Sequence, residues 1–220
     1  MSIRKSIALA LALAVVGTGV ASADNLILDT GTPPMLANGT PANNPATLNT
    51  VNWYAAEFYA TAGQTITELS AYLYPGTGGN SGSFTWDIYS STGFLANAHL
   101  SALYSSAGSF SSSAGTGEWS SLNNVNWTPT ASGYYWVALQ VSSTTQTHGI
   151  DLPVESSATG GTAPATAFAY AGTNHQYSTL NGVPVGLEVS AVPLPAAVWL
   201  LGSGLMGLGL FGRRRVKPTA

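Results

Sequence analysis

The chain has 220 residues, a formal net charge of −3 and no cysteine, and its six Lys and Arg residues all lie near the two ends. All nine Asp and Glu residues lie between these ends, in a stretch that contains no cation. The lack of cysteine excludes disulfide bonds, and a middle region without cations cannot neutralise phosphates, so no nucleic-acid partner is expected.

Residues 1–23 have the features of a secretory signal peptide. Two basic residues precede an apolar run over residues 7–16, which is too short to span a bilayer. Signal peptidase is expected to cleave after a small-x-small site whose two small residues are Ala21 and Ala23. The first mature residue is then Asp24; an uncleaved N-terminal anchor is the alternative.

Residues 24–190 are predicted to form one all-β domain, an antiparallel β-sandwich or jelly roll. Apolar and polar residues alternate with a period of two in several short segments, and no amphipathic helix of ordinary length interrupts them. Ile66 lies out of phase with the alternating row that begins at Leu69, which predicts a β-bulge near Thr67 and Glu68. The predicted strands cover residues 26–29, 53–59, 69–73, 84–89, 135–141, 166–170 and 183–189.

Three segments between these strands are predicted to be loops because Gly, Ser, Pro and Ala dominate them. Residues 75–82 have the composition of a tight turn or short loop. Residues 105–117 and residues 155–164 are expected to be surface loops.

Residues 191–220 form a distinct C-terminal segment with three parts. A Pro-bearing motif, residues 192–195, precedes an apolar stretch without charge, residues 196–212, and then a basic tail, residues 213–217. The apolar stretch is predicted to be a single transmembrane helix. The residues expected to stop translocation and keep the C-terminus in the cytoplasm are Arg213, Arg214 and Arg215. A simple permanent membrane anchor is one interpretation.

The order of these three parts resembles the PEP-CTERM sorting signal. The matching motif is made of Val192, Pro193, Leu194 and Pro195, with Leu194 where the family signature often has Glu. The resemblance implies export through the inner membrane of a Gram-negative bacterium that makes exopolysaccharide. It also implies transient membrane anchoring, cleavage near the motif by an exosortase-like enzyme, and a final place at the cell surface or outside the cell.

The middle of the chain is similar to the choice-of-anchor domains, type R. The segments that carry this resemblance are residues 52–58, 66–69, 84–89 and 133–137, within a span from about residue 26 to residue 152. The family implies a surface β-sandwich without an established biochemical activity, and it supplies no catalytic residues.

Asp29, Thr30 and Gly31 match the core of the aspartic protease motif, in which two such loops share a proton. The sequence holds no second Asp-Thr-Gly or Asp-Ser-Gly, and Asp29 lies close to the predicted mature N-terminus. A strand that ends in an Asp-Gly type turn is therefore the preferred interpretation. No catalytic residue and no enzymatic activity are predicted.

No metal site is predicted from the histidines, because His99, His148 and His175 lack the spacing of ligands and are interpreted as loop residues. No cofactor is expected. Oxygen-rich loops near Asp29, Asp87 or Asp151 leave a structural calcium ion as an alternative.

The many aromatic residues raise the possibility of sugar binding, since exposed Trp and Tyr rings stack on sugar faces. Trp119 and Trp136 are the candidates, and burial in the core of the sandwich is the competing interpretation. The sequence thus predicts an exported, non-enzymatic surface or matrix protein associated with exopolysaccharide or biofilm. A carbohydrate-binding module that acts on extracellular polysaccharide is the alternative, and a hydrolase is the least favoured class.

Overall fold

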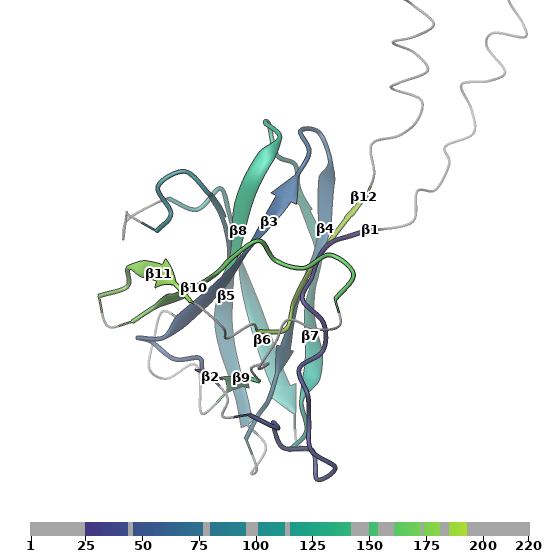
Figure 1. Cartoon of the computed structure of the whole chain (residues 1–220), viewed down its shortest axis with the longest axis vertical. Helices are drawn as coiled ribbons and strands as arrows, with labels where there is room; N and C mark the ends of the chain where they lie inside the picture. Colours follow the sequence, from purple (N-terminus) through teal and green to yellow (C-terminus); the bar gives the residue numbers. More distant parts are fainter. Residues whose placement is uncertain are drawn as a thin grey trace, which may run out of the picture. The chain divides into compact units, whose positions relative to one another are not determined.

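The computed structural model describes residues 25–43, 46–76, 80–95, 101–112, 115–141, 150–153, 161–172, 174–180 and 185–192. Every regular element in these residues is a β-strand, so the all-β prediction is confirmed there (Figure 1). No helix in the described ranges is long and apolar enough to cross a membrane. The predicted signal peptide and the predicted transmembrane helix lie outside the described residues.

The strands form two main antiparallel sheets and a short two-stranded one. The four-stranded sheet has the order β1 (Asn25–Asp29), β12 (Leu187–Val192), β4 (Thr65–Leu73) and β7 (Glu118–Trp127). The six-stranded sheet has the order β11 (Tyr177–Thr179), β10 (Phe168–Ala171), β3 (Trp53–Ala60), β8 (Gly133–Gln140), β5 (Asn80–Ser90) and β6 (Tyr104–Ser112). The small sheet pairs β2 (Ala46–Thr47) with β9 (Asp151–Leu152).

The two main sheets share one hydrophobic core. Alternate side chains of each strand point inward, as a sheet with one buried face requires. The four-stranded sheet supplies Leu28, Leu69 and Val189, and the six-stranded sheet supplies Phe58, Trp86 and Val137. Residues 24–192 form one compact unit that holds this whole cluster, so the unit has a complete core of its own.

The β-bulge predicted from the phase of the apolar residues is confirmed. The register between β4 and β7 shifts between Ile66 and Glu68, and Ile66 and Leu69 are both fully buried. The extra residue lets both side chains reach the core although an odd number of positions separates them.

The loop predicted over residues 105–117 is wrong over most of its length. Residues 104–112 form β6, which pairs with β5 without a register shift, and β7 begins at Glu118. Small polar residues have low intrinsic strand preference, but pairing with a long neighbouring strand and burial of Phe110 override it. The second of these strands, β7, also lies outside the strands predicted from the sequence.

The last strand begins later than predicted and continues to Val192. Ala191 is fully buried, and Val192 pairs with Thr65 of β4. The regular structure therefore runs through residues 191 and 192, past the boundary at residue 190 that the sequence predicts for the β domain.

A second cluster of buried residues lies on the face of the six-stranded sheet away from the main core. Phe94, in the segment after β5, stacks on Trp136 of β8 with ring centroids 4.7 Å apart, and on Tyr177 of β11 at 4.3 Å. Together with small residues of β3, β8 and β10, these rings bury part of the outer face. This cluster fixes the position of the β10–β11 hairpin against the sheet.

Candidate functional site

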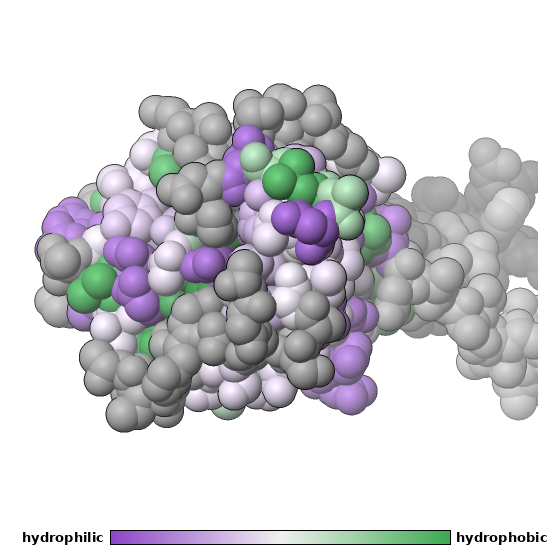
Figure 2. All heavy atoms as spheres, turned by 90° about the horizontal axis from the view of Figure 1, so that it is seen from below, coloured by the Kyte–Doolittle hydropathy of each residue, from purple (hydrophilic) through white to green (hydrophobic). Residues whose placement is uncertain are grey.

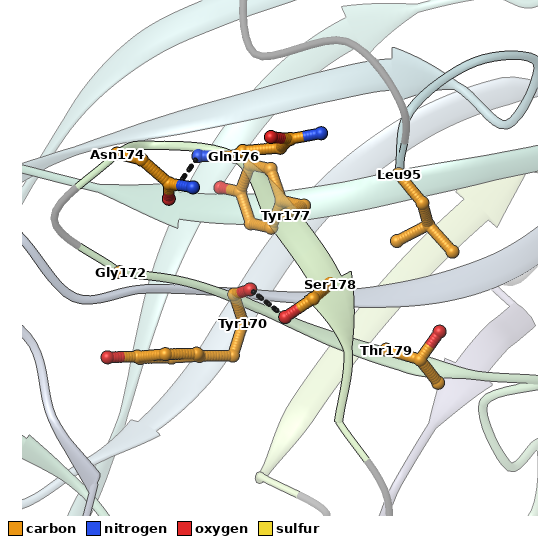
Figure 3. Close-up of a pocket in the computed structure, with 8 residues that line it drawn as sticks. All are labelled: Leu95, Tyr170, Gly172, Asn174, Gln176, Tyr177, Ser178 and Thr179. Atoms are coloured by element: carbon orange, nitrogen blue, oxygen red, sulfur yellow. Dashed lines mark hydrogen bonds between the residues drawn. The ribbon is translucent and has the colours of Figure 1, made fainter.

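The β10–β11 hairpin carries an open surface pocket of about 620 Å³. Figure 3 shows the side chains that line it, which come from the two strands, from the turn between them and from the segment after β5. The lining residues are Leu95, Tyr170, Gly172, Asn174, Gln176, Tyr177, Ser178 and Thr179.

The turn of the hairpin is shaped by local hydrogen bonds. The side-chain oxygen of Asn174 accepts a hydrogen bond from the backbone N–H of Gln176 at 3.1 Å, which is an Asx turn. His175 has a φ of 53° and donates its backbone N–H to the carbonyl of Gly172 at 2.8 Å. These contacts place Asn174 and Gln176 at the rim of the pocket with their side chains exposed.

The imidazole of His175 anchors the turn to the sheet. It stacks on Trp53 with ring centroids 4.2 Å apart and an angle of 8° between the planes. Its Nε2 lies 2.9 Å from the carbonyl oxygen of Thr50, and Trp53 donates its Nε1–H to the carbonyl of Val141 at 3.1 Å. His175 therefore holds the loop in place, which agrees with its interpretation as a loop residue.

Tyr177, which lines the pocket, belongs to a partly buried polar network. Gln140 donates its side-chain N–H groups to the hydroxyl oxygens of Tyr89, at 2.9 Å, and Tyr177, at 3.0 Å. Burial, with a smaller effect of the charge on Asp87, raises the pKa of Tyr89 to about 12. Burial likewise raises the pKa of Tyr177 well above its usual value. Both phenols are therefore neutral hydrogen-bonding groups at physiological pH.

The lining suits a neutral ligand that offers many hydroxyl groups. None of the eight lining residues carries a charge at neutral pH, and the two amide side chains of the turn are followed by hydroxyl-bearing side chains along β11. The hydroxyl of Ser178 donates to the backbone carbonyl of Tyr170 at 3.3 Å, an arrangement without an activating base. Such a surface can form hydrogen bonds to a sugar but lacks the paired acid and base of a hydrolase.

The sequence did not single out these lining residues for chemistry. Their side chains are common in loops, and only the fold brings both strands and Leu95 to one pocket. The short run of turn residues between two aromatic-bearing strands is the one local signal that marks this place.

The structure removes Trp136 from the candidate sugar-stacking residues. Its side chain is 2% exposed and one face of its ring is covered by Phe94. Trp136 belongs to the second buried cluster, so the competing interpretation as a core residue is correct for it.

Trp119 is half-buried on β7, at the edge of the four-stranded sheet. It packs edge-on against Tyr72 at 5.5 Å and donates its Nε1–H to the hydroxyl of Thr32 at 3.3 Å. More aromatic surface is exposed by Tyr59 and Tyr134, which pair edge to face across β3 and β8 and are 50% and 48% exposed.

Asp29 is a structural turn residue. One carboxylate oxygen accepts a hydrogen bond from the backbone of Gly31 at 2.9 Å, and the other accepts two from Thr162, at 2.7 and 2.9 Å. Burial by itself would raise the pKa of Asp29, but these hydrogen bonds outweigh it and lower the pKa. The adjacent Thr30 hydroxyl bonds to the backbone of Leu187 in β12 and of Val185 just before it. The motif therefore closes a turn, which agrees with the interpretation preferred from the sequence.

The three Asp residues considered for calcium lie at separate places. Asp29 ends β1, Asp87 lies within β5 and Asp151 begins β9. No group of three or more His, Asp or Glu side chains with the arrangement of a metal site occurs among the described residues. His99 and His148 lie outside these residues.

Only the first residue of the predicted sorting motif is described. Val192 is the last residue of β12 and is partly buried. The structure does not describe the rest of the motif, Pro193, Leu194 and Pro195, or the three arginines at 213–215. Ala21 and Ala23 of the signal cleavage site also lie outside the described residues.

No family model matches this chain, and a comparison with curated proteins finds no match either.

Proposed function

We propose that this chain is an exported surface or matrix protein without enzymatic activity, which an exosortase-like enzyme processes within residues 192–195. The observation that carries the proposal is the segregation of charge: every Lys and Arg lies in the terminal segments, and none lies between residues 6 and 212. A basic cluster after an apolar stretch suits a stop-transfer signal, while the acidic and neutral middle suits a body that is carried across the membrane.

The end of the last strand supports processing at this place. β12 is complete at Val192, and the two prolines that follow at 193 and 195 cannot donate backbone hydrogen bonds to a sheet. Cleavage beyond Val192 would leave every residue of the core cluster in the released product. The folded body would thus survive the loss of its delivery segment.

The strand order supports the finer jelly-roll assignment. The four-stranded sheet runs β1-β12-β4-β7, and the larger sheet contains the run β3-β8-β5-β6, with the β10–β11 hairpin added beside β3. Two interleaved four-stranded sheets of this order are what a chain folded as two Greek keys forms. The hairpin that carries the pocket is an addition to that framework.

The test is the mass of the mature protein recovered from its own cells. A C-terminus within residues 192–195 is expected, together with an N-terminus at Asp24. A product that retains Arg215 would mean a permanent anchor, and full-length chain dissolved in the cytoplasm would contradict export. Replacement of the three arginines at 213–215 by Ala leaves the rest of the sequence unchanged. It is expected to prevent the retention of the uncleaved chain in the membrane.

Carbohydrate binding is a second candidate, favoured by the neutral pocket of the β10–β11 hairpin. The probe is gel retardation of residues 24–192 in the presence of the producer's exopolysaccharide. Gln176→Ala with Thr179→Ala removes two polar groups of the lining and is expected to weaken retardation on the order of tenfold, at about 0.5–1.5 kcal/mol for each hydrogen bond. Tyr134→Ala, on the same sheet but outside the pocket, is the control. No retardation, or loss with the control alone, would contradict binding in the pocket.

A further inference from the structure

We propose that β6 is a self-association edge, which pairs antiparallel with β6 of a second copy and joins two six-stranded sheets into one. β6 is the outermost strand of its sheet, and its only strand partner among the described residues is β5. An unpaired edge presents a row of free backbone N–H and C=O groups, which is a template for another strand.

The direction of the backbone groups identifies the residues that would pair. The carbonyl of Ser109 accepts a hydrogen bond from the Ser120 hydroxyl of β7 at 3.2 Å, so it points away from β5. Alternate residues of an antiparallel strand turn their backbone groups in the same direction. The backbone groups of Ser105, Ala107 and Ser111 therefore also face outward, and none of them bonds to the backbone of another described element.

The other three edges of the two main sheets, as far as the described residues show them, carry features that discourage pairing. β7 bears Glu118, a register shift, and two Asn residues with positive φ. β1 has five residues and a register shift, and β11 has three residues. β6 has nine residues with no charge, no proline and no register shift against β5. Natural edge strands are usually protected by short length, bulges, charges or proline, so β6 stands apart.

A second copy can meet this edge without bringing acids together. The described residues contain acids but no Lys or Arg, so two copies repel each other wherever they bring acids together, and no cation can offset this. The uncharged β6 edge is a place where they can approach. The nearest acid on its neighbour strand, Asp87, is 4% exposed and bonded to Ser105.

The side chains of β6 also allow a two-fold arrangement. The outward-turned residues carry exposed side chains no larger than a hydroxymethyl group, while Phe110 points into the core. Antiparallel pairing of identical strands is isologous, so each Ser or Ala meets a Ser or Ala of the other copy. The Ser120 hydroxyl of β7 already bonds to the outward carbonyl of Ser109, so the second strand would use the other lone pair of that oxygen or displace this hydroxyl.

The first test is the association state of residues 24–192, which have a complete core, measured by sedimentation over a range of concentrations. A dimer is expected. Ala107→Lys with Ser109→Lys places like charges opposite each other at the seam and should raise the dissociation constant on the order of tenfold or more. Because Lys lowers the net negative charge of the body, such a loss could not come from general repulsion.

The matched control is Ser83→Lys with Thr85→Lys. These residues of β5 are the register partners of Ser109 and Ala107, so the same charge is added on the same face but one strand further in. The control is expected to remain dimeric, with circular dichroism confirming that both variants fold. A monomer at all concentrations, a dimer that resists the β6 variant, or equal loss in both variants would each overturn the proposal.

The second test uses the absence of cysteine from the chain. Single substitutions Ala107→Cys, Ser109→Cys and Ser111→Cys are made in the full-length chain, and a short thiol-to-thiol linker is applied to intact cells. Cross-linked dimers are expected from one or more of these positions, and the pattern gives the register. Thr179→Cys on β11, the opposite edge of the sheet, should give none; equal cross-linking there would overturn the assignment.

Discussion

At the scale of single residues, hydrogen bonding decides the role of the one motif that resembles catalytic chemistry. Asp29 is 8% exposed and its carboxylate accepts three hydrogen bonds from Gly31 and Thr162. These bonds tie the end of β1 to the segment before β10, far away in the sequence. A carboxylate held in this way connects two distant segments of the chain, and each of its oxygens already accepts at least one hydrogen bond.

Asp29→Asn is expected to destabilise the protein by about 1–3 kcal/mol, because an amide N–H would then face a backbone donor. The folded-state pKa of Asp29 is lowered, so its stabilising effect is present above the ordinary pKa of 3.8 and is lost as the pH falls through the lower folded value. Urea unfolding at pH 7 and near pH 3 measures this. If the Asp29→Asn variant loses as much stability between pH 7 and pH 3 as the wild type does, the role given to Asp29 is contradicted.

Trp136→Ala is expected to cost about 3–5 kcal/mol of stability, since it removes a buried ring from the cluster with Phe94 and Tyr177. Trp119→Ala, at a half-buried position on an edge strand, should cost clearly less. Thermal unfolding of the two variants gives the comparison. Similar losses from both substitutions would show that the second cluster adds little to the fold.

At the scale of elements, β12 is the last strand of the folded body, and the sorting segment that we propose would follow it. It lies between β1 and β4, and Leu187, Val189 and Ala191 are fully buried. Its sequence alternates as a strand requires, but its end could not be predicted from the local pattern. The sheet extends the strand because Thr65 and Ile66 of β4 offer partners up to Val192.

A chain that ends at residue 192 is expected to be as stable as one that ends at residue 195. A chain that ends at Gly186 lacks β12, so β1 loses the one strand with which it pairs among the described residues, and the core is opened. This shorter chain should not fold. Circular dichroism and thermal unfolding of the three chains test the expectation, and a cooperative transition in the shortest one would contradict it.

The contrast between β4 and β6 shows which elements a sequence can reveal. The bulge in β4 was predictable because buried apolar residues record the phase of the strand on both sides of it. β6 consists mainly of small residues, and its alternation of exposed and buried positions leaves almost no trace in hydropathy. Its strand conformation depends on pairing with β5, the long strand that precedes it.

At the scale of the whole molecule, the surface is built from weakly polar residues. Among the coloured residues of the face drawn in Figure 2, pale residues lie between several hydrophilic groups and small separate hydrophobic groups. The described body has acids without cations, so its carboxylates have no ion-pair partners of the Lys or Arg type. The pH dependence of its stability should therefore differ from that of an ordinary protein, in which protonation of acids at low pH breaks stabilising ion pairs.

The melting temperature is expected to rise as the pH falls from neutral toward the ordinary carboxyl pKa values of 3.8 and 4.5. Burial raises the pKa of Asp87 and Asp151, and burial with the nearby charges of Asp29 and Glu68 raises the pKa of Glu188. A group with a raised folded pKa gives stability that is complete below its unfolded pKa and is lost as the pH rises through the folded value.

Below the ordinary carboxyl pKa the trend should reverse as Asp29 becomes protonated. Calorimetry across this range locates the maximum, and added salt at pH 8 should raise the melting temperature by screening repulsion between the acids. A melting temperature that falls steadily as the pH falls from neutral toward the ordinary carboxyl pKa would contradict this account of the charges.

Composition and the local phase of the apolar residues were enough to predict the absence of disulfides, the placement of all cations in the terminal segments, the antiparallel all-β class and the bulge near Glu68. Long-range packing was needed to place Trp136 in a core cluster, to join Asp29 to Thr162, to make an edge strand of a run of Ser, Ala and Gly, and to form a neutral pocket on a hairpin. These outcomes depend on contacts between residues far apart in the chain, and such contacts leave no mark in the hydropathy of any one segment.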